Sequence, residues 1–207
     1  MMKHRRTNSP LFMLRTGLVA TGASLVLAGC VSLAPKAPDQ LLRLTPARSA
    51  PAGSAVKGKL ADAIVVLDPE ADRSLDALRV PVRVDGSSLA YLKGADWVEK
   101  PTRQFRSLLA ETIRADTGAM VLEGGDYEGA GKTFIGGTLL DMGYDAQTSS
   151  VVVRFDAVRS ERGSEELERK RFEVVIGNIE PKAEAVGPAL NTAANDIAQQ
   201  VAEWIKS

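Results

Sequence analysis

Histidine and cysteine are almost missing from this 207-residue sequence, which holds one His, His4, and one Cys, Cys30. If the first 29 residues are a leader that is removed, the remaining chain has no imidazole. That excludes Ser-His-Asp and Cys-His catalysis and histidine-ligated metals. A single cysteine cannot form an internal disulfide. We therefore expect no catalytic residues, no metal site and no cofactor.

A basic surplus is also missing, because 26 Lys and Arg residues are matched by 26 Asp and Glu residues. The first 29 residues hold four of the basic residues (Lys3, Arg5, Arg6 and Arg15) and no acidic one. Without them, 22 basic residues face 26 acidic ones, a formal charge of about −4. A nucleic-acid-binding protein shows the opposite balance, so we expect no nucleic-acid partner. The 44% apolar and 25% charged residues are ordinary for a globular protein.

The N-terminus has the pattern of a secretory signal peptide. A basic start is followed by an uncharged apolar run over 17–28, and small residues end at Gly29, directly before Cys30. This run is shorter than the roughly 20 residues that a transmembrane helix needs. The alternative is an uncleaved N-terminal anchor with a buried cysteine.

The residues Leu27-Ala28-Gly29-Cys30 resemble the lipobox of bacterial lipoproteins. The resemblance implies cleavage between Gly29 and Cys30, a diacylglyceryl group on the Cys30 sulfur and an acyl group on its new amine. Two or more acyl chains anchor a protein stably, whereas one chain holds it only marginally. Cys30 is followed by Val31 and Ser32 and not by Asp, which resembles lipoproteins sorted to the outer membrane.

We predict three parts of the chain. Residues 1–29 are the signal peptide. Residues 30–60 are the lipidated cysteine and a flexible tether rich in Pro, Ala and Gly, with a brief strand at 41–44. Residues 61–207 are one globular domain.

Hydrophobic periodicity predicts two helices and several strands in that domain. The helix at 101–117 has an apolar stripe, a proline at its start and Gly118 after its end. A second amphipathic helix is predicted at 188–205. Strands are predicted at 63–67, 79–84, 88–92, 119–122, 134–144, 151–157 and 171–176.

These elements predict an α/β fold: a single domain in which two amphipathic helices pack on a mixed, largely antiparallel sheet. In the longest strand, alternate residues from Phe134 to Tyr144 share one face. Val151, Val153, Phe155 and Ala157 share one face of the next strand. Pro81 cannot donate to a strand ladder, so its strand is predicted at a sheet edge.

Three motifs resemble a phosphate loop, a calcium loop and a catalytic carboxylate pair, but each lacks a feature that the site needs. The glycine-rich run 124–133 ends in Gly-Lys-Thr, but Asp126 stands where a phosphate loop needs glycine, and a strand follows instead of a helix. The acidic run 68–72 has Arg73 where a calcium loop needs glycine. Glu165, Glu166 and Glu168 lie in a predicted hairpin turn, so we interpret them as solvated.

The two tryptophans, Trp97 and Trp204, lie beside amphipathic stripes. We interpret both as core residues whose indole N–H groups find a partner at the edge of the core. The alternative is contact with lipid or with a partner protein.

Several segments in order resemble the ABC-type transport auxiliary lipoproteins. They are the lipobox, Val66 to Ala71, Leu75-Asp76, Arg79-Val80, Tyr91, Ala95 to Glu99, Phe105 to Ile113, Gly137 to Leu140, Val153 to Ala157, Arg171 to Glu173 and Trp204-Ile205. Paraquat-inducible protein C of enteric bacteria is a more distant relative. The family has no catalytic motif to carry over, and Cys30 is the one functional residue that the resemblance transfers.

The resemblance implies an accessory subunit of a lipid-transporting ABC system. Its partners would be a mammalian-cell-entry-type substrate-binding protein and the ABC permease complex, and its location the periplasmic side of the outer membrane, in the inner leaflet. We predict a partner surface at Tyr91, Trp97 and Glu99. Direct contact with phospholipid and a homo-oligomer remain open. The alternative functions are a periplasmic envelope hydrolase and another outer-membrane assembly lipoprotein.

Overall fold

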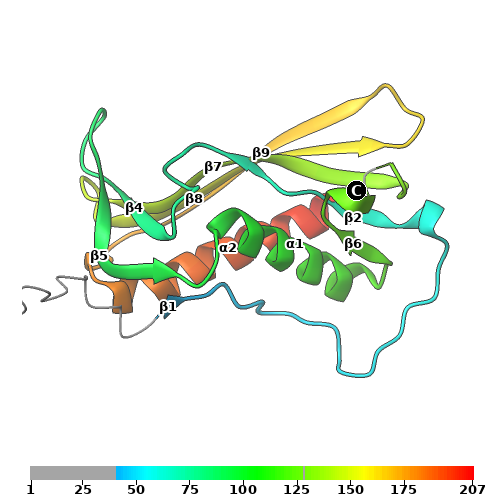
Figure 1. Ribbon diagram of the computed structural model, residues 1–207, viewed down its shortest axis with the longest axis horizontal. Helices are drawn as coiled ribbons and strands as arrows, with labels where there is room; N and C mark the ends of the chain where they lie inside the picture. The colour runs from blue at the N-terminus through cyan, green and yellow to red at the C-terminus, as the bar shows by residue number, and fades with distance from the viewer. Residues whose placement is uncertain (1–40, 128) are drawn as a thin grey trace, which may run out of the picture. The chain divides into compact units, whose positions relative to one another are not determined.

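The computed structural model describes residues 41–207 except residue 128. Within these residues the chain forms a nine-stranded mixed sheet with two α-helices, which confirms the predicted α/β fold (Figure 1). The helices are α1 (Pro101–Thr117) and α2 (Ala183–Ile205). The strands are β1 (Leu41–Leu42), β2 (Ile64–Val66), β3 (Glu70–Ala71), β4 (Arg79–Arg83), β5 (Leu89–Trp97), β6 (Val121–Glu123), β7 (Thr133–Asp145), β8 (Ser150–Glu161) and β9 (Leu167–Ile176).

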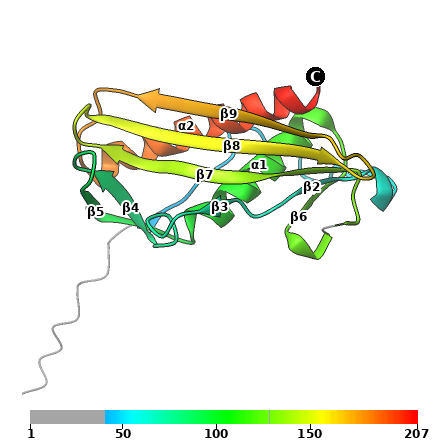
Figure 2. The same cartoon turned by 90° about the horizontal axis from the view of Figure 1, so that it is seen from above.

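The sheet is organised around β7, its longest strand. Along one edge of β7 lie the short strands β2, β3 and β4, one after another and all parallel to it. Along the other edge lies β8, antiparallel over its whole length, followed by β9. The view from above shows these three long strands side by side, with the helices behind them (Figure 2). The predicted antiparallel meander is therefore confirmed for β7, β8 and β9.

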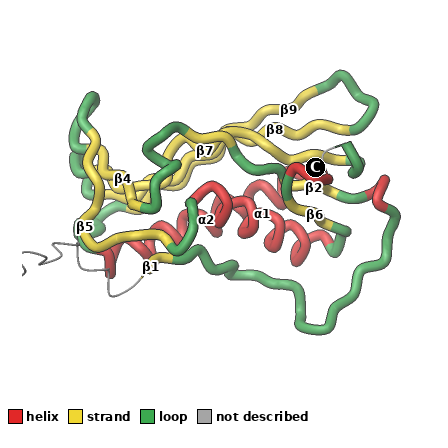
Figure 3. Tube along the Cα trace, in the orientation of Figure 1, coloured by secondary structure: helices red, strands yellow, loops and turns green. Residues whose placement is uncertain are grey.

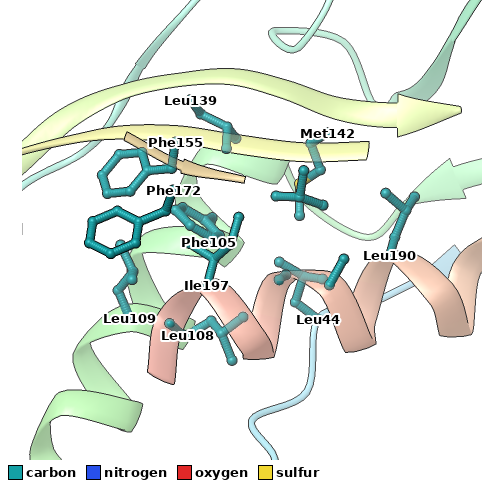
Figure 4. Close-up of a cluster of buried hydrophobic side chains, with 14 of the residues drawn as sticks. Leu44, Phe105, Leu108, Leu109, Leu139, Met142, Phe155, Phe172, Leu190 and Ile197 are labelled. Carbon is teal, nitrogen blue, oxygen red and sulfur yellow. The ribbon is translucent and has the colours of Figure 1, made fainter. Parts of the chain in front are cut away.

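Both helices pack on one face of the sheet. Phe105 of α1 meets Phe155 of β8 with ring centroids 5.1 Å apart, and Phe172 of β9 meets Trp204 of α2 at 5.8 Å. Figure 4 shows leucines and phenylalanines from the sheet and the helices meeting in one cluster, which also includes Leu44. One continuous core therefore joins the helices to the sheet.

Helix α1 begins and ends at the predicted residues. Pro101 occupies its first turn, where a missing N–H costs nothing. Gly118 adopts φ 65° and donates its N–H to the Arg114 carbonyl, as glycine does after a helix.

The predicted start of α2 at Pro188 is wrong, because the helix begins five residues earlier, at Ala183. Pro188 has no N–H to donate to the preceding turn, which removes one hydrogen bond worth about 1 kcal/mol. Val186, in that earlier turn, is fully buried, and burying a valine contributes about 1.5 kcal/mol or more. Gly187 lies close to Leu42, where an added Cβ would come within 2.6 Å of the leucine methyl group.

The predicted alternation along β7 is wrong in its first half. Ile135 and Leu139 are the buried residues there, and Met142 and Tyr144 are buried in the second half. The register shifts between Leu139 and Asp141, so one extra residue changes which face each side chain takes. Alternation within β8 and β9 is as predicted.

The predicted edge position of the Pro81 strand is also wrong. Strand β4 lies between β5 and β7. Its pairing with β5 is irregular between Arg79 and Pro81, and a proline is tolerated at such an irregularity. On the other side, an added Cβ at Gly143 would come within 2.5 Å of the Pro81 carbonyl oxygen, so glycine permits the close approach.

Candidate functional site

The predicted lipidation and cleavage residues, Cys30 and Gly29, lie outside the described residues, and the division at residues 29 and 60 stays a prediction. No helix among residues 41–207 is long and apolar enough to cross a membrane. The same residues contain no cluster of three metal-ligating side chains.

The predicted partner-surface residues lie on β5 and in the turn that leads into α1, and they differ in burial. The Tyr91 side chain is half-buried, with the Arg79 guanidinium 4.0 Å from the centre of its ring. Glu99 is exposed and pairs with Arg103 at 3.3 Å. Trp97 is only 2% exposed, so its side chain belongs to the core, and its indole N–H has no hydrogen-bond partner among the described residues. Tyr91 and Glu99 therefore remain accessible, whereas the prediction of Trp97 as a partner-surface residue is wrong, because its side chain is buried in the core.

The other tryptophan matches the core interpretation fully. Trp204 is 5% exposed and donates its indole N–H to Glu168 at 2.7 Å. Glu168 also pairs with Arg159 at 2.7 Å, so it acts as a structural acceptor.

Beside Glu99, one buried amide joins three parts of the fold. Gln104 of α1 is 7% exposed. Its Nε2 donates to the Glu99 carbonyl at 2.7 Å, and its Oε1 accepts the Leu44 N–H at 2.9 Å. The turn after β5, the start of α1 and the segment after β1 are therefore fixed to one another by a single side chain.

We call the segment Arg43–Ala50 the strap, because it runs from β1 along the helices (Figure 3). It forms neither helix nor strand, and side chains of both helices satisfy its backbone. Asn191 accepts the Thr45 N–H at 2.7 Å, and Asn195 accepts the Ala47 N–H at 2.6 Å. Asn195 also donates to the Thr45 carbonyl at 3.0 Å.

The far end of the strap is held by α1. Glu111 accepts the Ala50 N–H at 2.8 Å, and Arg48 pairs with Asp116 at 2.9 Å. Leu44 is the buried side chain of the strap, and it is 7% exposed. The strap thus lies within the predicted 30–60 tether but is seated on the globular domain.

The opposite face of the sheet carries a ladder of alternating charge. Arg83 of β4 pairs with Asp141 of β7 at 2.8 Å. Arg154 of β8 joins Asp141 to Glu173 of β9. Strand alternation places these side chains away from the helices, because Phe155 and Phe172 face the core. These four side chains are therefore partly exposed and pair with one another.

A second ion pair on this face changes two pKa values. The hydrogen bonds from Arg171 lower the pKa of the Asp156 carboxyl, with distances of 2.5 and 2.7 Å, and the same contact raises the pKa of Arg171. Elsewhere, hydrogen bonds from Ser87 and Ser88 lower the pKa of Asp85. The carboxyl groups with a resolved shift among the described residues, Asp85, Asp156 and Glu180, all have a lowered pKa, whereas a general acid needs a raised pKa.

The glycine-rich run, the acidic run and the glutamate cluster lie in ordinary strands and turns. Thr133 begins β7, so a strand follows the glycine-rich run, as predicted. Glu70 and Ala71 pair with β7 next to a turn. Leu167 begins β9 after the 162–166 turn, which confirms the predicted hairpin. The predicted position of Glu168 in that turn is wrong, because Glu168 lies in β9, where it binds Trp204 and Arg159.

Sequence reasoning missed the residues that hold the strap: Gln104, Asn191, Asn195, Glu111 and Asp116. One signal was available, because Asn191 and Asn195 lie one turn apart on one face of α2. Asparagine is unfavourable within helices unless its side chain has a specific partner.

Comparisons with known proteins support the fold. The search of curated proteins found no match. Protein XCC0632 from Xanthomonas campestris, of the family DUF330, superposes with a TM-score of 0.64 at 18% identity, covering 80% of this chain and 94% of that one. A second crystal structure, titled as an uncharacterized protein, gives a TM-score of 0.63 at 11% identity and covers 80% and 97%.

A family model described as "ABC-type transport auxiliary lipoprotein component" matches residues 43–202. The match begins at the first residue of the strap and ends within α2, so it includes α1, most of α2, strands β2 to β9 and the residues that hold the strap. The chain therefore belongs to the family of ABC-type transport auxiliary lipoprotein components.

Proposed function

We propose that the protein is a lipid-anchored accessory subunit of a lipid-transporting ABC system. It is anchored through Cys30 in the inner leaflet of the outer membrane and faces the periplasm. It binds and positions a mammalian-cell-entry-type substrate-binding protein and its permease, and it carries out no chemical reaction itself. The family match over residues 43–202 is the observation that carries this proposal.

The accessible part of the predicted surface supports a docking role. Leu89 and Val98, near the two ends of β5, are 52% and 46% exposed, and Tyr91 and Glu99 lie beside them in sequence. Apolar and aromatic groups bordered by charges are the usual composition of a protein interface. We therefore assign the partner surface to the β5 side of the domain, without the buried Trp97.

Mass spectrometry of the protein purified from membranes tests the anchor. The N-terminal peptide is expected to begin at Cys30 and to carry a diacylglyceryl and an acyl group. The Cys30→Ser variant should be absent from the membrane fraction. An unmodified Cys30 with the leader still attached would refute the anchor.

Photocrosslinking in intact cells tests the partner surface. A crosslinking amino acid is placed at Tyr91 or at Glu99, with Ser164 in the β8–β9 turn as the matched exposed control. The β5 positions should yield crosslinks to the substrate-binding protein or permease, and Ser164 should not. Crosslinks only to another outer-membrane assembly factor would favour that alternative function, and equal crosslinking from all three positions would contradict the assigned surface.

A further inference from the structure

The strap determines how much chain separates the domain from its lipid anchor. Residues 31–40, ten in all, lie between Cys30 and the first residue of β1. An extended chain spans at most about 3.3–3.6 Å per residue, so this link reaches no more than about 35 Å. Without β1 and the strap, the next strand to hold the chain is β2 at Ile64. The link would then be residues 31–62, because Ala63 is buried and its carbonyl accepts the Lys132 N–H, and its limit is about 110 Å.

We propose that β1 and the strap form a releasable part of the tether, and that their docking sets how far the domain can stand from the bilayer. This inference rests on the proposed function through the lipid anchor at Cys30. Docked, the strap holds the domain near its own membrane. Released, it allows the same domain to reach partners about three times farther away.

The contacts of the strap are of a kind that can be exchanged for water. Its backbone is held by the amides of Gln104, Asn191 and Asn195 and the Glu111 carboxylate, in place of a continuous strand ladder. Of these bonds, the one from the Leu44 N–H to Gln104 is buried. The hydrogen bonds to both asparagines are solvent-exposed, and water competes with exposed hydrogen bonds. Leu44 is its buried side chain, and β1 adds two pairs with β5, at Leu41 and Leu42.

The chain on the far side of the strap already permits release. Residues 51–60 are all exposed, and their backbone hydrogen bonds are local turns: the Ser54 N–H donates to Pro51, and the carbonyls of Lys59 and Leu60 accept from the two residues that follow them, Asp62 and Ala63. The sheet and helices do not need the strap to meet, because Phe105 and Phe155 contact each other directly. Release can therefore occur without unfolding of the domain, as local opening does in other proteins.

Hydrogen exchange tests release in the full lipidated protein, in nanodiscs of phosphatidylethanolamine and phosphatidylglycerol. In the wild type, amides of the strap should exchange at least tenfold faster than those of α1. The double variant Asn191→Ala with Asn195→Ala should accelerate strap exchange at least tenfold more and leave α1 unchanged. The matched control, Gln199→Ala with Gln200→Ala, alters two amides of the same helix outside the strap and should leave strap exchange unchanged.

Two results of that experiment would overturn the proposal. One is strap exchange as slow as that of α1 in the wild type. The other is equal acceleration of strap and α1 in the asparagine variant, which would mean that the strap separates only when the domain unfolds.

Energy transfer to the bilayer tests the change in reach. In a Ser164→Cys variant, a thiol-reactive donor fluorophore labels only the introduced cysteine, because lipidated Cys30 has no free thiol. Labelled lipids act as acceptors. The asparagine variant should show lower transfer efficiency than the wild type, and the glutamine control should match the wild type. Unchanged transfer in a lipidated protein would overturn this inference alone, whereas an unmodified Cys30 would overturn the proposed function as well.

Discussion

Individual glycines show where this fold tolerates no side chain. Gly137 of β7 has φ 135°, a conformation that is almost confined to glycine. A Cβ there would come within 2.0 Å of the Asp156 carbonyl oxygen on β8. That neighbour is backbone in the middle of the sheet, so it cannot move aside as the end of a side chain can.

The variant Gly137→Ala is therefore expected to lower the free energy of unfolding by about 3 kcal/mol or more, through steric overlap and backbone strain. Urea denaturation followed by circular dichroism measures the loss. Gly177→Ala is the control, because a Cβ at Gly177 meets no atom within 4 Å and its φ is not positive. Equal stability of the two variants would contradict this account of Gly137.

The Asp156–Arg171 pair predicts a pH dependence. The hydrogen bond from Arg171 lowers the pKa of Asp156 in the folded protein, so the pair stabilises the fold above the unfolded pKa of about 4. This stabilisation is lost as the pH falls through the lower, folded pKa. The wild type should therefore exceed Asp156→Asn in urea midpoint at pH 7, and the difference should shrink below pH 4.

A double-mutant cycle isolates that contribution. In an Arg171→Gln background, Asp156→Asn should produce a smaller change in urea midpoint at pH 7 and a weaker dependence on pH. An unchanged difference in that background would show that other groups cause the effect.

At the scale of elements, the register shift in β7 decides which of two neighbouring leucines is buried. Leu139 is fully buried against the helices, whereas Leu140 is only partly buried on the other face. Leu139→Ala should cost about 2–5 kcal/mol of unfolding free energy, as deletion of buried leucine side chains does. Leu140→Ala should cost less than half as much. Urea unfolding of the two variants compares them, and a larger loss for Leu140→Ala would contradict the observed register.

The same strand explains which elements could be predicted from sequence. Helix α1 was predicted to the residue, because its apolar stripe, Pro101 and Gly118 are all local signals. The faces of β7, the interior position of β4 and the start of α2 depend on distant neighbours such as β8, Gly143 and Leu42. A local pattern does not contain those neighbours.

In the candidate site, too, local sequence marks some residues, whereas others depend on distant neighbours. Cys30 is marked by contiguous residues, and its lipidation stays a prediction because it lies outside the described part of the chain. The residues that hold the strap are up to 150 positions from their backbone partners, so only the folded chain brings them together. The burial of Trp97 was indicated by its apolar neighbours, but its unpartnered indole N–H was not.

At the scale of the whole molecule, one core predicts one unfolding transition. Trp97 at the end of β5 and Trp204 at the end of α2 both belong to the same buried cluster. Each variant Trp97→Phe and Trp204→Phe leaves one tryptophan as a local probe. Within each variant, fluorescence and circular dichroism should give the same urea midpoint. Separate midpoints would show that the β5 end and the α2 end unfold independently.

The strap also bears on how the protein would be shed from its membrane. If the chain is anchored at Cys30 as proposed, residues 51–60 offer a protease an accessible place to cut, since every one of them is exposed. Cleavage there cuts the covalent link, yet the severed N-terminal piece still holds the helices through Leu44, Gln104 and the two asparagines. A nicked molecule would therefore stay at the envelope as a two-piece complex and leave it only when those contacts open.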